Sequence, residues 1–263
     1  MNKYLFRKNS IQRLFSAIFL IIISLFSIYY SGIILICFGS FLIFFITYEY
    51  VNITENINTV ILKITKSLLN IIIFVLSTFS FKFAIIFYLL VSLLNLFQKN
   101  TAKNNIFYVL IGPIYLCLPF IFLYNIRLLN NGLDLLIWLL LIVWTTDSFS
   151  FYFGKLIGGK KLLLSLSPNK TWSGLLCGII AGTLISIFCF YIKNYNLVDA
   201  FIYGLILSIF TQIGDLFESW IKRKHFIKDS GYLIPGHGGF LDRLDGLLIS
   251  SIFLYIGHIY YGI

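Results

Sequence analysis

The chain has 263 residues, of which 59% are hydrophobic and 11% are charged. Soluble domains carry about a quarter charged residues, so this composition excludes an ordinary soluble globular protein. The formal net charge of +10 requires no nucleic-acid partner, because basic residues that flank membrane helices face anionic lipid headgroups. Apolar stretches of membrane-spanning length recur along the chain, so we predict an all-α polytopic membrane protein.

Nine transmembrane helices are predicted in chain order, with polar breaks between them. Basic residues precede the first apolar run, but no small-residue cleavage site closes it, so we expect an uncleaved first helix. The third and fourth spans are short enough to be tilted, merged or partly re-entrant. The predicted spans are residues 14–30, 33–50, 67–81, 83–98, 106–124, 133–149, 173–192, 197–217 and 246–261.

The distribution of basic residues predicts the orientation of these helices. If the N-terminus is cytoplasmic, only Lys82, Arg127 and Lys193 of the 20 Lys and Arg residues fall on the outer side. Positive charge concentrates on the cytoplasmic side of membrane proteins, so this orientation is favoured. It places both charged loops, residues 150–172 and 218–245, on the cytoplasmic face.

The chain divides into two predicted parts. Residues 1–130 form N-terminal transmembrane helices with few distinctive polar residues, whereas residues 131–263 form a C-terminal transmembrane part that carries nearly all of them. We therefore expect the C-terminal part to be catalytic. The four cysteines lie within apolar segments without metal-binding spacing, which is typical of small core residues. They are Cys37, Cys117, Cys177 and Cys189.

Half of the acidic residues gather in one short segment, since five of the ten lie between Asp215 and Asp245. Asp215 follows an apolar run, where an unpaired carboxylate is costly, and this position indicates function. If the helix continues, Asp215 shares one face with residues three, four and seven positions later, which are Glu218, Ser219 and Lys222. For Glu218 alone, a solvated helix end is the simpler interpretation.

Asp242 and Asp245 lie three residues apart at the start of the ninth span, on one helical face. Either acid alone would suit the positive end of the helix dipole. Together, opposite Asp215 at the end of the preceding helix, they make a better cup for a divalent cation. Magnesium prefers such oxygen ligands. We predict that Asp215 and Asp242 bind Mg²⁺, with Asp245 assisting.

The segment between these acids contains Pro235-Gly236-His237-Gly238-Gly239. Glycines allow backbone N–H groups to approach a phosphate closely, and nearby basic residues offer counter-charge. The same basic run, taken alone, is typical of a positive-inside anchor. That run consists of Lys222, Arg223, Lys224 and Lys228.

A second polar block lies between the sixth and seventh spans. Asp147 sits late in an apolar span, which indicates function. Gly154 and Gly158 have the spacing of a helix-packing motif. Residues 167–171 are predicted to form a turn into the seventh helix, where Lys170 and the helix N-terminus would hold an anion.

Taken together, these motifs resemble the signature of the phosphatidate cytidylyltransferase family, whose members are also called CDP-diacylglycerol synthases. The resemblance covers roughly residues 140–250, and the N-terminal half is similar only in being apolar and multi-spanning. The family usually has Glu where this chain has Ser173. The matching segments are Asp147–Gly154, Ser167–Thr171, Ser219–Arg223, Lys228–Asp229, Pro235–Gly239 and Asp242–Asp245.

The resemblance implies transfer of a cytidylyl group from CTP to phosphatidic acid, giving CDP-diacylglycerol and pyrophosphate in phospholipid biosynthesis. It implies Mg²⁺ as cofactor and a site on the cytoplasmic face of a bacterial-type inner (cell) membrane. Metal ions and basic side chains suit this reaction, because two polyanions must meet and pyrophosphate must leave. Acyl-chain preference, use of dCTP, a second monovalent ion and the oligomeric state stay open, a homodimer included.

Combined with these patterns, the resemblance implies roles for individual residues. Asp147 and Lys170 are expected to line the same cavity as Asp215. Catalytic roles are expected for Asp215, Ser219, Lys222, His237, Asp242 and Asp245. Substrate-binding roles are expected for Asp147, Lys170, Arg223, Lys228, Asp229, Gly238, Gly239 and Arg243.

Two alternatives remain. A membrane enzyme acting on a polyprenyl phosphate would share the aspartates and the magnesium, and the nucleotide consumed would separate it. A transporter would place isolated charges at mid-membrane, whereas the charges here gather at one predicted face.

Overall fold

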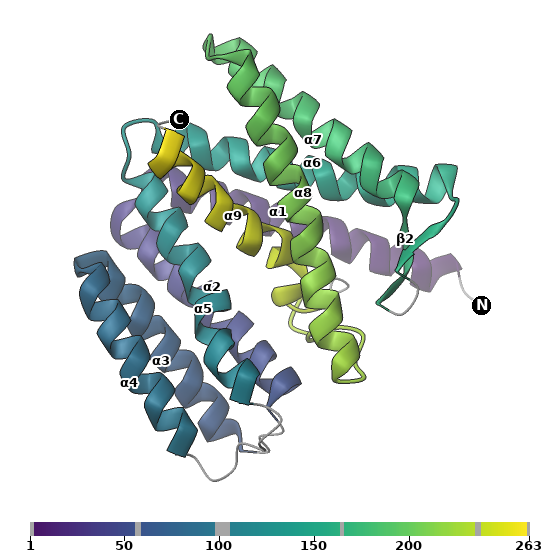
Figure 1. Cartoon of the computed structure of the whole chain (residues 1–263). Helices are drawn as coiled ribbons and strands as arrows, with labels where there is room; N and C mark the ends of the chain where they lie inside the picture. The colour runs from purple at the N-terminus through teal and green to yellow at the C-terminus, as the bar shows by residue number, and fades with distance from the viewer. Residues whose placement is uncertain (1–2, 56–58, 98–105, 164–165, 235–237, 262–263) are drawn as a thin grey trace. The chain divides into compact units, whose positions relative to one another are not determined.

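The computed structural model describes residues 3–55, 59–97, 106–163, 166–234 and 238–261. These residues are almost entirely helical, and one short β-hairpin interrupts the helices (Figure 1). The helices are α1 (Lys3–Tyr30), α2 (Gly32–Thr54), α3 (Val60–Phe79), α4 (Phe81–Phe97), α5 (Ile106–Arg127), α6 (Gly132–Ile157), α7 (Trp172–Lys193), α8 (Leu197–Lys224) and α9 (Leu241–Tyr261). The strands are β1 (Lys161–Leu163) and β2 (Ser167–Thr171).

Six of these helices are long and apolar enough to cross a membrane, namely α2, α3, α5, α6, α7 and α8. The predicted helical architecture is therefore confirmed, and its apolar helices indicate a membrane protein. Two further helices, α1 and α4, contain shorter apolar runs. The third and fourth predicted spans are separate helices that meet at Ser80.

The hairpin corrects one prediction. Residues 167–171 do not form a turn but a strand, β2, which pairs antiparallel with β1 through Lys161 opposite Thr171 and Leu163 opposite Ser167. Pro168 and its neighbours have turn propensity, yet the cross-strand pairing dominates over this local preference. The strand leads directly into α7, so the correction concerns this short segment and not the helical fold.

By its internal contacts the chain forms two compact units. One contains residues 1–124 together with 225–243, and the other contains residues 125–224 together with 244–263. We refer to them as the N-terminal unit and the C-terminal unit. The glycine-rich segment before α9 thus belongs with the N-terminal helices, although it lies far away in the sequence. The boundary falls within the first turn of α9.

Small and hydroxyl-bearing residues lie where α6, α7 and α8 pack against one another in the C-terminal unit. The Thr146 hydroxyl lies 3.3 Å from the Ser208 hydroxyl, and a side chain at Gly182 would collide with both. Such small residues allow membrane helices to approach closely. Gly154 follows this pattern, because a Cβ there would touch Gly174 of α7.

Gly158 does not take part in this packing, contrary to the helix-packing interpretation. It follows the last residue of α6 with a φ of 65°, and an added Cβ would meet no atom within 4 Å. A left-handed backbone conformation is inexpensive only for glycine. Gly158 therefore ends α6 instead of packing it.

The N-terminal unit is richer in buried polar contacts than the sequence predicted. Glu55 at the end of α2 forms a buried ion pair with Lys66 of α3, and the Asn70 amide donates to the Thr47 hydroxyl over 3.0 Å. Buried polar groups require such partners. These contacts fix α2 against α3.

Candidate active site

Helix α8 extends beyond its predicted span to Lys224, so its charged residues lie on one continuous helix. Asp215 forms an ion pair with Lys170 of strand β2, and both side chains are partly exposed, at 30% and 22%. The hairpin thus brings a basic residue from between α6 and α7 to the end of α8. Sequence spacing alone placed these two residues only in the same general cavity.

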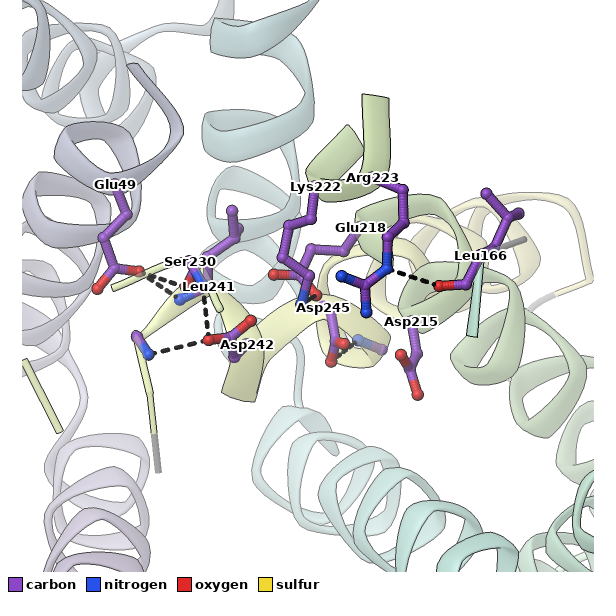
Figure 2. Close-up of polar contacts among 12 residues, drawn as sticks. Glu49, Leu166, Asp215, Glu218, Lys222, Arg223, Ser230, Leu241, Asp242 and Asp245 are labelled. Carbon is purple, nitrogen blue, oxygen red and sulfur yellow. Dashed lines mark hydrogen bonds and ion pairs between the residues drawn. The ribbon is translucent and has the colours of Figure 1, made fainter. Parts of the chain in front are cut away.

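One turn further along α8, the Lys222 ammonium donates to the Glu218 carboxylate over 2.7 Å. The Glu218 side chain is almost fully buried, at 1% exposure. The Arg223 guanidinium instead donates to the Leu166 carbonyl over 3.1 Å, beside the hairpin (Figure 2). Neighbouring basic residues on this helix therefore have different partners. Lys222 contacts an acid of its own helix, whereas Arg223 contacts the hairpin segment.

Asp245 completes a group of acids in the C-terminal unit. It is buried, lies outside the six apolar spans, and its carboxylate accepts a hydrogen bond from the Gly246 N–H over 2.7 Å. Burial raises the pKa of Asp245 well above its usual range, and repulsion by Asp215, Glu218 and Asp147 raises it further. We call Asp147, Asp215, Glu218 and Asp245 the carboxylate cluster.

The carboxylate cluster has the chemistry of a divalent-cation site. Its oxygen donors repel one another, so a cation among them would remove an electrostatic cost. Within the residues that the structure describes, no three acidic, histidine or cysteine side chains stand ready to hold a metal on their own. Magnesium usually takes only one or two carboxylates and completes its shell with water and substrate phosphates. The donor set therefore fits Mg²⁺ whose remaining ligands are water or phosphate oxygens.

The second group of acids lies in the N-terminal unit and holds the loop before α9. One oxygen of Asp242 accepts hydrogen bonds from the backbone N–H groups of Ser230, at 2.9 Å, and Gly239, at 3.0 Å. Glu49 of α2 accepts from the Phe240 N–H, the Leu241 N–H and the Ser230 hydroxyl, at 2.9 to 3.1 Å (Figure 2). Among these donors, the Leu241 N–H lies in the first turn of α9, where a helix leaves N–H groups without an internal acceptor.

The glycines of this loop accommodate carboxylates of the chain itself. Gly238 has a φ of 85°, and an added Cβ would lie 2.6 Å from Asp242. A Cβ at Gly239 would collide with Glu49 and Ser230. The Gly239 N–H donates to Asp242, and its role in binding a substrate phosphate stays a prediction.

The remaining predicted residues have varied surroundings. Ser219 is half-buried on α8, whereas Lys228, Asp229 and Arg243 are exposed. His237 lies outside the described residues. At the position where an acid was expected, the Ser173 hydroxyl donates to the Gly158 carbonyl and joins the end of α6 to the start of α7.

Glu49 was not among the predicted site residues. It lies within a predicted span, and an acid at that depth is the signal that singled out Asp147 and Asp215. Its partners are 181 to 192 residues away, so no local pattern connects it to the loop.

Comparison with known proteins identifies the family of this chain. The model of the cytidylyltransferase family matches residues 11–261. The chain belongs to this family. A phosphatidate cytidylyltransferase of Rickettsia conorii is 38% identical over 169 residues, which are 61% of this chain and 74% of that protein.

A phosphatidate cytidylyltransferase of Rickettsia felis is 35% identical over 206 residues, 74% of this chain and 90% of that protein. A phosphatidate cytidylyltransferase of Staphylococcus aureus is 39% identical over 143 residues, 54% of each chain. The resemblance drawn from the motifs is thereby confirmed.

Proposed function

We propose that the carboxylate cluster, together with Lys170 and Lys222, is the place where this chain transfers a cytidylyl group. The reaction follows from the family and the names of the relatives. CTP and phosphatidate give CDP-diacylglycerol and pyrophosphate. Two observations support this location. Buried Asp245 is repelled by Asp215, Glu218 and Asp147, and two of these acids pair with Lys170 and Lys222.

The chemistry matches these residues. A phosphate oxygen of phosphatidate attacks the α-phosphorus of CTP, and the bond to the β-phosphate breaks as pyrophosphate leaves. The attacking phosphate is already ionised, so no strong general base is required. The main difficulty is repulsion between two polyanions, which cations at the site reduce. The ammonium groups of Lys170 and Lys222 are suited to bind phosphate oxygens.

Asp215 and Asp245 would hold Mg²⁺ in the C-terminal unit, with Asp147 and Glu218 adding negative charge around it. Bound Mg²⁺ would polarise the phosphoryl group and neutralise the leaving pyrophosphate. Asp242 was the other predicted ligand, and its contacts with Ser230 and Gly239 support a loop-holding role as well. A ligand role for Asp242 would change the Mg²⁺ dependence of turnover. A loop-holding role would lower turnover even at saturating Mg²⁺.

An assay with purified protein tests this function. Radiolabelled CTP and phosphatidate in detergent micelles should give labelled CDP-diacylglycerol and pyrophosphate in a Mg²⁺-dependent reaction. Absence of product with phosphatidate, together with product from a polyprenyl phosphate, would overturn the assignment. Size measurement of the same preparation would test the homodimer that the sequence left open.

We also propose nine spans with a cytoplasmic N-terminus and the site at the cytoplasmic face of the inner membrane. The positive-inside bias supports this topology. Single cysteines introduced at Lys160 and Lys228, in an otherwise cysteine-free chain, should react only with reagents that reach the cytoplasmic side. Labelling of the two positions from opposite sides would contradict the span count.

A further inference from the structure

Glu49 connects an N-terminal helix to the loop that carries the family signature. Its carboxylate accepts three hydrogen bonds from residues that precede or begin α9, namely Ser230, Phe240 and Leu241. The Glu49 side chain is buried, at 3% exposure, as are Ser230 at 3% and Leu241 at 0%. A buried carboxylate is tolerated when several donors compensate its lost hydration.

The loop is shaped to receive this carboxylate. A Cβ at Gly231 would lie 2.6 Å from Glu49, and a Cβ at Gly239 would also collide with it. One turn earlier on α2, the Phe45 ring stacks on the Phe240 ring, with centroids 5.2 Å apart. Polar and aromatic contacts from one face of α2 therefore fix the same end of the loop, and Figure 2 shows the polar contacts of Glu49.

Glu49 and Asp242 hold the loop through shared residues. Ser230 donates its hydroxyl to Glu49 and its backbone N–H to Asp242. Gly239 donates its N–H to Asp242 and leaves the space that Glu49 occupies. Displacing Glu49 would therefore release Ser230 and the first turn of α9, on which Asp242 and, one turn later, Asp245 are carried.

We propose that Glu49 is a positioning residue for cytidylyl transfer: it fixes Ser230, Phe240 and the start of α9, and so orients the acids of that helix. This inference rests on the proposed function of Asp242 and Asp245. Glu49 contacts the loop and contributes no reacting group. Its loss should therefore lower turnover while leaving the chain folded.

The test compares Glu49→Gln with Glu55→Gln in the full-length protein. Both changes neutralise a buried acid of the same helix end, but Glu55 pairs with Lys66 and not with the loop. Glu49→Gln places an amide N–H against backbone N–H donors, and we expect a loss of turnover of about 10- to 100-fold, as for other residues that orient a catalytic group. Glu55→Gln should change turnover less than about threefold, whatever its effect on melting temperature, because its partner lies outside the loop.

The conservative change Glu49→Asp should retain more activity than Glu49→Gln, because the negative charge and both acceptor oxygens persist. Equal losses in Glu49→Gln and Glu55→Gln would show that general destabilisation explains the effect, and would overturn the proposal. Inactive wild-type protein would instead contradict the proposed function.

A double-mutant cycle with Ser230→Ala adds a measurement that simple destabilisation would not affect. Ser230→Ala combined with Glu49→Gln should lose little more turnover than Glu49→Gln alone, because both changes remove the same contact. Combined with Glu55→Gln, the effects on turnover should multiply. Multiplicative losses in both pairs would overturn the positioning role.

Discussion

The two acid-rich regions of this chain use their carboxylates in opposite ways. In the C-terminal unit, Asp245 is repelled by Asp215, Glu218 and Asp147, and two of these acids pair with lysines. In the N-terminal unit, Glu49 and Asp242 receive five hydrogen bonds from the loop, four of them from backbone N–H groups. The first arrangement would gain from a bound cation, as we propose, whereas the second is satisfied by the protein itself.

This difference shows that the role of a carboxylate depends on the groups that surround it. A carboxylate surrounded by N–H donors is held in one place and fixes the backbone around it. A carboxylate facing other carboxylates raises the free energy of the folded state and gains by binding a metal. Replacing an acid of the carboxylate cluster should therefore lower activity without lowering stability. Removing an acid that holds the loop should lower stability.

The largest effect is expected for Asp245→Asn. Loss of this proposed ligand should reduce turnover by about 100- to 1,000-fold, the usual cost of removing one electrostatic stabiliser. The melting temperature should not fall, because a neutral side chain relieves the repulsion from Asp215, Glu218 and Asp147. A clear drop in melting temperature with full activity would show that Asp245 has a structural role like that of Glu49 and Asp242. The two acid-rich regions would then not differ.

Lys170→Met should have a smaller effect, about tenfold in turnover or ~1.4 kcal/mol. It removes the cation that pairs with Asp215 in a partly buried position. The matched control is Lys193→Met, since Lys193 pairs with Asp134 at an exposed position of the same unit and should be dispensable. Equal activities of Lys170→Met and Lys193→Met would show that Lys170 has no role in the reaction.

Two substitutions of Asp242 distinguish a loop-holding role from a metal-binding role. Asp242→Ala leaves the Ser230 and Gly239 N–H groups without their acceptor, which costs about 1–3 kcal/mol and should lower the melting temperature. Asp242→Asn keeps an oxygen that accepts both N–H groups and should preserve stability. If Asp242→Asn also keeps normal turnover at limiting Mg²⁺, Asp242 acts only on the loop.

The sequence predicted one of these regions better than the other. Asp215 and Asp147 interrupt apolar runs, so the cost of burying charge is enough to single them out from the sequence alone. The same argument applies to Glu49, but its partners lie 181 or more residues away. Tertiary contacts of this length leave no periodic signal. The strand at 167–171 was missed for a similar reason, because its pairing with β1 outweighs the turn preference of Pro168.

The smallest effect is expected along the last turns of α8. Lys222→Ala should weaken substrate use about threefold to tenfold more than Arg223→Ala, because Lys222 lies against Glu218 of the carboxylate cluster and phosphate contacts of this kind are charge-assisted. Arg223 contacts the hairpin at Leu166. Michaelis constants for CTP and phosphatidate would measure the difference. The reverse order would show that α8 presents its other face to the substrates.

The most direct test of the carboxylate cluster as the catalytic metal site is a Mg²⁺ titration of CDP-diacylglycerol formation by Asp215→Asn. Asp134→Asn is the control, since Asp134 forms the exposed ion pair with Lys193. We expect Asp215→Asn to stay at least about 100-fold below wild type even at saturating Mg²⁺, with an unchanged melting temperature, and Asp134→Asn to match wild type. Near-normal turnover of Asp215→Asn at limiting Mg²⁺, with the wild-type midpoint, would contradict the account.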